Sequence, residues 1–129
     1  DTITGNNGFM GARGYPCPPF SIGIGLGGQM DVAAKLSREA ISTRSWLDHN
    51  PDPLFDELEQ ELLADINMLG NGPAGIGGDT SALAVKIDWA ATHTAICPVV
   101  IHFHCWVARR FGLRFYPDGR TEELFQVGE

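Results

Sequence analysis

The sequence predicts an α/β domain of α+β-like character, with helices packed against a mixed sheet that includes an antiparallel strand pair near the C-terminus. Three observations lead to this fold class. Apolar runs typical of strands stand at 20–24, 84–89 and 98–103, helical periodicity extends over 31–41 and 53–69, and glycine-rich stretches lie between them. One strand, two helices and then two strands are typical of a mixed sheet covered by helices, in which the runs at 84–89 and 98–103 could pair as antiparallel neighbours. A chain of 129 residues, 43% of them hydrophobic, is long enough to bury a core as one domain.

The two ends of the chain are expected to lie outside this core. Residues 1–16 are rich in glycine and asparagine without periodicity, which predicts a loop or an arm. Residues 17–113 are expected to form the domain, with a last helical segment at Trp106–Leu113. Residues 114–129 are expected to form a C-terminal tail with a turn at Pro117–Gly119.

The second helix carries the clearest sequence pattern. Asp52 is suited to cap it, Pro53 to its first turn and Gly70 to its end. An apolar stripe at helical spacing is formed by Leu54, Phe55, Leu58, Leu62, Ile66 and Leu69. Acidic residues in its first half are favoured by the helix dipole and are expected to form a solvated face: Asp56, Glu57, Glu59 and Glu61.

Charge and cysteine content narrow the class of function. A net charge of −7 argues against a nucleic-acid-binding surface. No apolar run reaches the length of a membrane span, and the N-terminus lacks signal-peptide features. An odd number of cysteines does not suit a secreted disulfide framework, so Cys17, Cys97 and Cys105 are expected to be thiols or metal ligands in a cytoplasmic protein. The chain starts at Asp1 without a methionine, as expected of a processed product or a piece of a longer chain.

Two glycine clusters are candidate anion sites. Gly23-x-Gly25-x-x-Gly28 matches the dinucleotide fingerprint, but residues 42–52 offer no second strand ending in an acid, so a tight turn against another anionic group is favoured. The second cluster, at 75–80, combines backbone amides with nearby hydroxyls, which suits a carboxylate or phosphate. A plain helix-to-strand connection explains the second cluster equally well.

The stretch THTAICPVVIHFHC, at 92–105, contains two cysteines and three histidines. If 98–105 is a strand, alternation places Cys105 on the face opposite to His102 and His104. These three residues are therefore not expected to bind one ion, and the two histidines are expected to face solvent. Functional residues are expected instead where the loop enters the strand, at His93 and Cys97.

Three collinear segments together resemble the iron–sulfur hydro-lyases of the class I fumarase and L-tartrate dehydratase α-subunit type. They are CPPFSIGIGLGGQMDVAAKLSREAI (17–41), NPDPLFDELEQELLADINMLGNGPAGIGGDTSALAVKI (50–87) and THTAICPVVIHFHCWVARR (92–110). The family has Cys-Pro-Pro before a glycine-ended strand, a glycine-rich loop leading to Thr-x-Ala-Leu-x-Val-Lys-Ile, then Thr-His-x-Ala, and a cysteine shortly before Ala-Arg-Arg. The resemblance covers most of the chain and implies the C-terminal part of the α region.

This resemblance implies a [4Fe–4S] cluster held by three cysteines, with one iron open for substrate. Cys17 matches the family's second ligand and Cys105 its third, whereas the first lies in a Cys-Gln-Asp-Thr-Gly segment that these residues do not contain. Cys97 matches no ligand and is expected to be a buried thiol. His93 matches the active-site histidine that contacts the substrate. The candidate substrate-binding residues near the same cavity are Gly77, Gly78 and Thr80.

The implied function is reversible dehydration of a small hydroxy-dicarboxylate of the fumarate/malate or tartrate type. The family's β part, a second subunit or domain, completes the site, so we expect a β partner, an oligomer and an inactive isolated chain. Two alternatives stay open: a non-catalytic binding or subunit module without a cluster, and a nucleotide-binding domain. Trp106 departs from the smaller or polar residue expected after the ligand cysteine.

Overall fold

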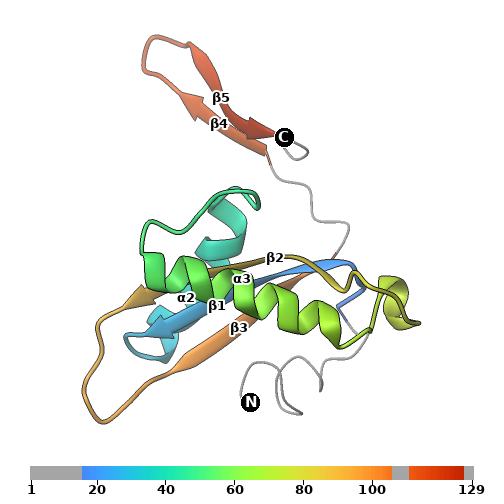
Figure 1. Cartoon of the computed structure of the whole chain (residues 1–129). Coiled ribbons are helices and arrows are strands. Elements are labelled where there is room, and N and C mark those ends of the chain that lie inside the picture. The colour runs from blue at the N-terminus through green and yellow to red at the C-terminus, as the bar shows by residue number, and fades with distance from the viewer. Residues whose placement is uncertain (1–15, 106–110, 127–129) are drawn as a thin grey trace.

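The computed structural model describes residues 16–105 and 111–126, and its core is a three-stranded mixed sheet (Figure 1). The strand order is β2-β1-β3, with β1 (Phe20–Gly27) in the centre, β2 (Ala82–Ala90) on one side and β3 (Val99–His104) on the other. β1 runs parallel to β2 and antiparallel to β3, which confirms the mixed sheet.

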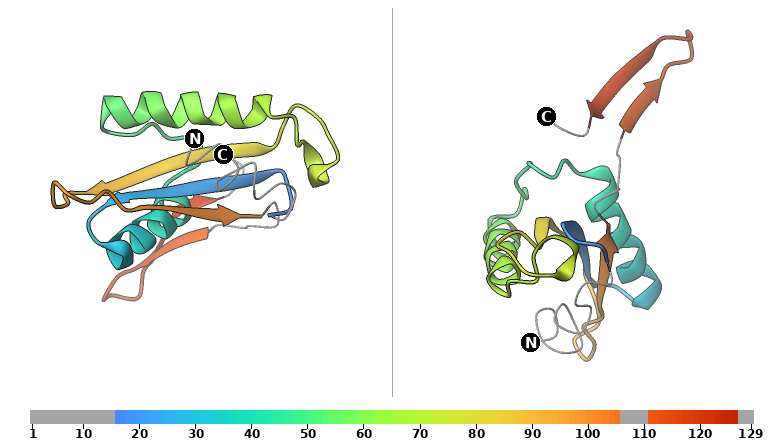
Figure 2. Two further views of the ribbon diagram at one scale, coloured as in Figure 1. Left: turned by 90° about the horizontal axis from the view of Figure 1, so that it is seen from below. Right: turned by 90° about the vertical axis from the view of Figure 1, so that its right-hand side faces the viewer.

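Two helices cover opposite faces of the sheet, as Figure 2 shows. Helix α2 (Met30–Thr43) follows β1, and helix α3 (Pro53–Met68) leads through a short 3-10 helix, η1 (Pro73–Gly75), into β2. The expected cap of α3 is confirmed, because the Asp52 carboxylate accepts a hydrogen bond from the backbone N–H of Leu54 at 3.0 Å. Gly70 follows the helix with a φ of 68°, a left-handed conformation that glycine adopts without strain.

The described part of the chain also contains a hairpin, formed by β4 (Phe111–Phe115) and β5 (Thr121–Gln126). This antiparallel pair near the C-terminus agrees with the expected fold class. The turn at Pro117–Gly119 is confirmed, since Gly119 N–H donates to the carbonyl of Tyr116 at 3.0 Å. The helix expected at 106–113 is wrong for 111–113, which lie in β4, and 106–110 lie outside the described residues, as does most of the expected arm at 1–16.

The specific pairing expected between 84–89 and 98–103 is wrong, because β1 lies between β2 and β3. The connection from β1 through the helices returns the chain parallel to β1 on one side. The loop at 91–98 then carries the chain past the end of β1 and back along its other side. Two apolar runs joined by a short loop do not reveal that a third strand separates them.

Glycine on one face of β1 allows α2 to lie directly on the strand. A Cβ atom built on Gly23 would lie 1.9 Å from the carbonyl oxygen of Ser37, and one on Gly25 would lie 1.9 Å from that of Ala33. These glycines are inside β1 and under α2, not in a loop that faces a ligand. The dinucleotide fingerprint is therefore wrong for this chain, and close packing explains the glycines.

The opposite face of β1 builds the apolar core with α3. Ile22 and Ile24 are fully buried there against Leu62 and Ile66. The core is extended by Phe20, Ala82, Val85 and Ile87. β1 thus separates two kinds of packing, with backbone against helix on one face and interlocking side chains on the other.

The outer edge of β2 is bonded by polar side chains. Asn67 of α3 accepts from the backbone N–H groups of Ser81 and Ala82 and donates to the carbonyl of Ala82. Farther along, Glu59 accepts from the N–H of Ile87 at 2.8 Å. Unpaired N–H and C=O groups at a sheet edge invite association with other strands, so these side chains protect the sheet.

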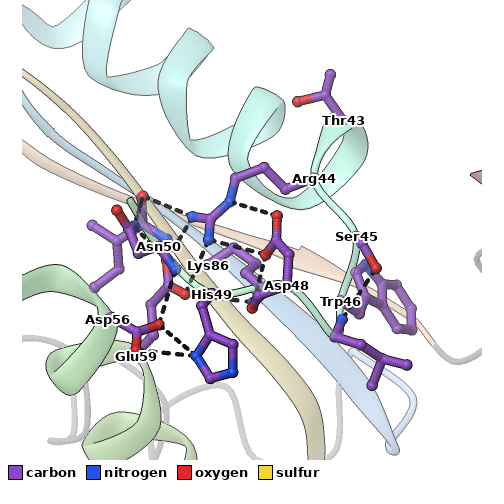
Figure 3. A network of polar contacts seen from close by, with 12 residues as sticks. Thr43, Arg44, Ser45, Trp46, Asp48, His49, Asn50, Asp56, Glu59 and Lys86 are labelled. Atoms are coloured by element: carbon purple, nitrogen blue, oxygen red, sulfur yellow. Dashed lines mark hydrogen bonds and ion pairs between the residues drawn. The ribbon is translucent and has the colours of Figure 1, made fainter. Parts of the chain in front are cut away.

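Glu59 is also the centre of a buried ionic network (Figure 3). It is only 4% exposed, and its carboxylate accepts from Arg44 at 2.6 Å and from Lys86 at 3.5 Å. Arg44 and Asn50 both donate to the carbonyl of Ile87, which completes the bonding of that residue. The expected solvated acidic face is therefore wrong for Glu59.

Asp48 joins the network from the linker between the helices, where it bonds Lys86 at 2.9 Å and Arg44 at 3.1 Å. Burial raises the pKa of the Asp48 carboxyl, but the hydrogen bonds from Lys86 and Arg44 outweigh this and hold the pKa below its usual range. Burial likewise lowers the pKa of Arg44, and the hydrogen bonds and charges of Glu59 and Asp48 more than offset it.

Replacement of Gly25 by alanine is expected to destabilise the fold by about 3 kcal/mol, the upper end for overpacking, because a backbone carbonyl cannot move aside as a side chain does. Gly119→Ala is the control: it meets no atom within 4 Å, and its left-handed φ of 85° costs about 1 kcal/mol. Urea unfolding of both variants measures the difference. Equal losses would contradict the close packing of α2.

Glu59→Ala is expected to lower the free energy of unfolding by about 3 kcal/mol or more, because Arg44 and Lys86 lose their buried counter-charge. Glu57→Ala, on the exposed side of the same helix, is the matched control and should change stability by less than about 0.5 kcal/mol. Chemical denaturation monitored by circular dichroism compares the two. A Glu59→Ala protein as stable as the control would refute the role of the network.

Candidate active site

One end of the sheet, which we call the thiol edge, gathers the start of β1, the start of β2 and the end of β3. The backbone N–H of Phe20 donates to the carbonyl of Ser81 at 3.1 Å, and Ser21 is paired with His104. The segments that continue from these strand ends carry Cys17 and Cys105. Both predicted cluster ligands therefore lie at the thiol edge, although 88 positions separate them in sequence.

Cys17 has an unusual backbone conformation. Its φ of 57° lies in the left-handed region, which costs a non-glycine residue about 1–2 kcal/mol. The side chain is exposed, whereas that of Cys105 is half-buried. Strained non-glycine residues are concentrated at functional sites, which makes this position a candidate in its own right.

The second glycine cluster lies beside Cys17. The N–H of Ala74 donates to the carbonyl of Pro18 at 3.0 Å, which joins the two loops. Gly72 approaches Gly77 so closely that a Cβ on Gly72 would lie 2.2 Å from the Gly77 carbonyl carbon. Gly77, Gly78 and Thr80 are exposed, and the N–H of Gly77 already donates to Asn71 at 2.8 Å. Gly77 therefore shapes the loop, and Gly78 and Thr80 are left exposed on it.

The thiols present fit an iron–sulfur cluster only in part. Cys17 and Cys105 share the thiol edge, but across residues 16–105 and 111–126 no three or more histidine, cysteine or carboxylate side chains are grouped to hold a metal ion. Cys97 is exposed, so the expectation of a buried thiol is wrong, and it lies at the other end of the sheet, next to Pro98, whose carbonyl bonds Gly27. The structure thus offers two candidate ligands at one end of the sheet.

His93 lies at the end of the sheet opposite the thiol edge. Its loop is tied to the end of β1 by the Thr92 hydroxyl, which donates to the carbonyl of Gly28 at 2.7 Å. A hollow of about 470 Å³ opens there, between this loop and the start of α2. The imidazole Nδ1 accepts a hydrogen bond from the backbone N–H of Ala95 at 3.1 Å, a contact that no side-chain pattern predicts.

The length of β1 separates His93 from the two cysteines. Its eight residues extend over roughly 25 Å at a rise of about 3.3 Å per residue. The structure therefore brings Cys17, Cys105 and the glycine loop to one edge, and it places His93 and its hollow at the other.

The histidine pair of β3 lies on the face predicted by alternation. Ile101 and Phe103 pack toward the core, whereas the rings of His102 and His104 lie 5.5 Å apart on the α2 face. The expected exposure to solvent holds only in part, because both are half-buried and the Ser42 hydroxyl lies 3.3 Å from His104 Nε2. Burial, together with the charges of His104 and Arg38, lowers the pKa of His102.

Comparison with known proteins shows the family to which the chain belongs. The fumarate hydratase (Fumerase) family model matches residues 9–114, and the chain belongs to this family. A putative L(+)-tartrate dehydratase subunit alpha from Methanocaldococcus jannaschii is 46% identical over 109 residues, which are 84% of this chain. The L(+)-tartrate dehydratase subunit alpha of Escherichia coli K12 is 38% identical over 108 residues.

The chain spans only 38% of the length of the M. jannaschii protein and 35% of the E. coli protein. The family match and these relatives confirm the resemblance seen in the sequence. Because the chain spans only part of the relatives, the matches do not show the activity of the whole enzyme. Within the described ranges, no helix is both long and apolar enough to cross a membrane.

The free energy of unfolding is expected to fall as pH drops from 7 to 5, with a contribution from His102. Because its native pKa is lowered, the unfolded chain takes up the proton first below the ordinary value of 6.5, so stability is present above that pH and lost below it. His102→Asn should flatten this pH dependence in urea titrations. Parallel curves for the variant and the parent would contradict it.

Proposed function

We propose that the chain is part of the α region of an iron–sulfur hydro-lyase that reversibly dehydrates a hydroxy-dicarboxylate of the fumarate/malate or tartrate type. The observation that carries this proposal is the common position of Cys17 and Cys105 at the thiol edge, beside an exposed glycine loop. Membership of the fumarate hydratase family supports the reaction class.

Cys17 and Cys105 would serve as two of three thiolate ligands of a [4Fe–4S] cluster. The third would come from a part of the enzyme outside these residues. When bound, the cluster supplies an iron with an open position that polarises the substrate hydroxyl. The backbone strain at Cys17 supports its assignment, because a glycine would adopt this φ at lower cost but would provide no thiolate.

The exposed glycine loop would hold a substrate carboxylate. Gly78 and Thr80 offer backbone amides and a hydroxyl beside Cys17, and Gly77 keeps the loop in shape through its bond to Asn71. A carboxylate is well suited to such a concentration of backbone amides. The loop would thereby orient the substrate relative to the thiol edge.

His93 would contact the substrate, but one copy of the chain does not bring it to its own thiol edge. β1 keeps the two ends roughly 25 Å apart. In an oligomer, His93 of one copy would lie at the thiol edge of a second copy, so the distance within one chain would not matter. This arrangement agrees with the expected oligomer. The names of the relatives, which are alpha subunits, support a β partner for this chain as well.

The isolated 129 residues would lack the third ligand and the β part and are expected to be inactive. The cytoplasmic location stays a prediction that follows from the cysteine content.

The proposal is tested by anaerobic reconstitution of the full enzyme with iron and sulfide. The parent protein is expected to develop the broad visible absorbance of an iron–sulfur cluster and hydro-lyase activity on malate or tartrate. Cys17→Ser and Cys105→Ser should each lose most of both, because a hydroxyl is a poorer ligand for iron than a thiolate.

Cys97→Ser is the matched control, since this thiol lies at the opposite end of the sheet, and it should keep the absorbance and activity of the parent. A reconstituted parent enzyme without any visible absorbance would refute the cluster and favour a non-catalytic module of the same fold. Loss of absorbance in Cys97→Ser alone would show that the ligand assignment is wrong.

A further inference from the structure

The hydrogen bond at His93 determines which ring nitrogen carries the proton. The backbone N–H of Ala95 donates to Nδ1 at 3.1 Å, so in the neutral ring this nitrogen is the acceptor. A neutral imidazole has one N–H and one acceptor nitrogen, and the partner of one nitrogen sets the state of the other. The proton of neutral His93 therefore resides on Nε2.

The loop holds Ala95 and His93 in this relation by backbone and side-chain bonds on both sides. The N–H of Ile96 donates to the carbonyl of His93 at 3.0 Å, which closes a tight turn over 93–96. Thr92 and Pro98 attach the two ends of the loop to Gly28 and Gly27 at the end of β1. The amide of Ala95 is thus fixed by the turn, independently of any ligand.

Besides the imidazole, the uncharged polar side chains among the described residues that line the hollow are Gln29 and Thr92. Among the described residues that line it, none is lysine or arginine, and Asp31 contributes a carboxylate. Val32 and Ile96 give it apolar walls. An imidazole N–H in such surroundings is suited to donate to an uncharged or singly charged oxygen, such as a hydroxyl or one carboxylate oxygen of a hydroxy acid.

We propose that Ala95 is a positioning residue, whose amide holds His93 in the Nε2–H form so that His93 donates a hydrogen bond to a substrate oxygen and does not abstract a proton. The identity of the substrate rests on the proposed function, whereas the protonated nitrogen does not. The proton on the carbon next to the leaving hydroxyl is then taken by a base outside this loop.

The ring state is measured by ¹⁵N NMR of the histidine side chains in the 129-residue chain at about pH 9, where unperturbed imidazoles are neutral. The His93 spectrum should show a proton on Nε2 and none on Nδ1. His49 is the internal control, because its Nδ1 lies 3.1 Å from both oxygens of the Asp56 carboxylate, which only accepts hydrogen bonds. Its spectrum should therefore show the proton on Nδ1. A proton on His93 Nδ1 would overturn the proposal.

Two variants at position 95 distinguish the effect of the backbone N–H on His93 from that of the Ala95 side chain. Ala95→Pro removes the N–H and is expected to give a mixture of both ring forms at His93. Ala95→Gly retains the N–H and should give the parent spectrum. An unchanged His93 spectrum in folded Ala95→Pro would overturn the role of the amide.

The direction of hydrogen bonding to substrate is tested in the reconstituted full enzyme. His93→Leu removes the donor and is expected to lower kcat/KM about 100-fold. His93→Gln keeps an N–H but cannot act as a base, and it should recover about tenfold of this loss. Equal loss in both variants would overturn the donor role. Absence of hydro-lyase activity in the parent would refute the proposed function and leave the NMR result standing.

Discussion

The contact between α2 and the glycine face of β1 determines the arrangement of the rest of the domain. Because Gly23 and Gly25 carry no side chain, the helix backbone lies directly on the central strand. The opposite face of β1 is then left to the apolar core with α3, and β2 and β3 complete the two sides. The ends of β1 define the two edges at which the candidate functional residues lie.

Local signals predicted α2, α3 and the three strands of the sheet, but not the strands of the β4–β5 hairpin, and they gave little information on contacts between elements. The Asp52 cap and Gly70 depend on nearby residues, and the sequence placed both. Glu59 appeared to belong to a solvated face, because its partners Arg44 and Lys86 are 15 and 27 positions away in sequence. The same limit explains why β1 was not expected between β2 and β3.

The candidate site was likewise predictable from the sequence only in part. Family motifs selected Cys17 and Cys105, and the topology explains their common edge, since β1 begins where β3 ends. No motif indicates that His93 lies at the far end of β1, because that depends on strand direction. The Ala95 amide was also beyond prediction from the sequence, since every residue type except proline carries the same N–H.

The hydrogen bonds along the outer edge of β2 limit where the chain tolerates a circular permutation or an inserted domain. The segment at 44–52 looks like an ordinary connection between helices, but Arg44 and Asn50 hold the backbone of Ile87. A circular permutation or domain insertion there would release an edge strand and favour aggregation. The turn around Gly119, where a Cβ meets nothing, is the better place for new termini.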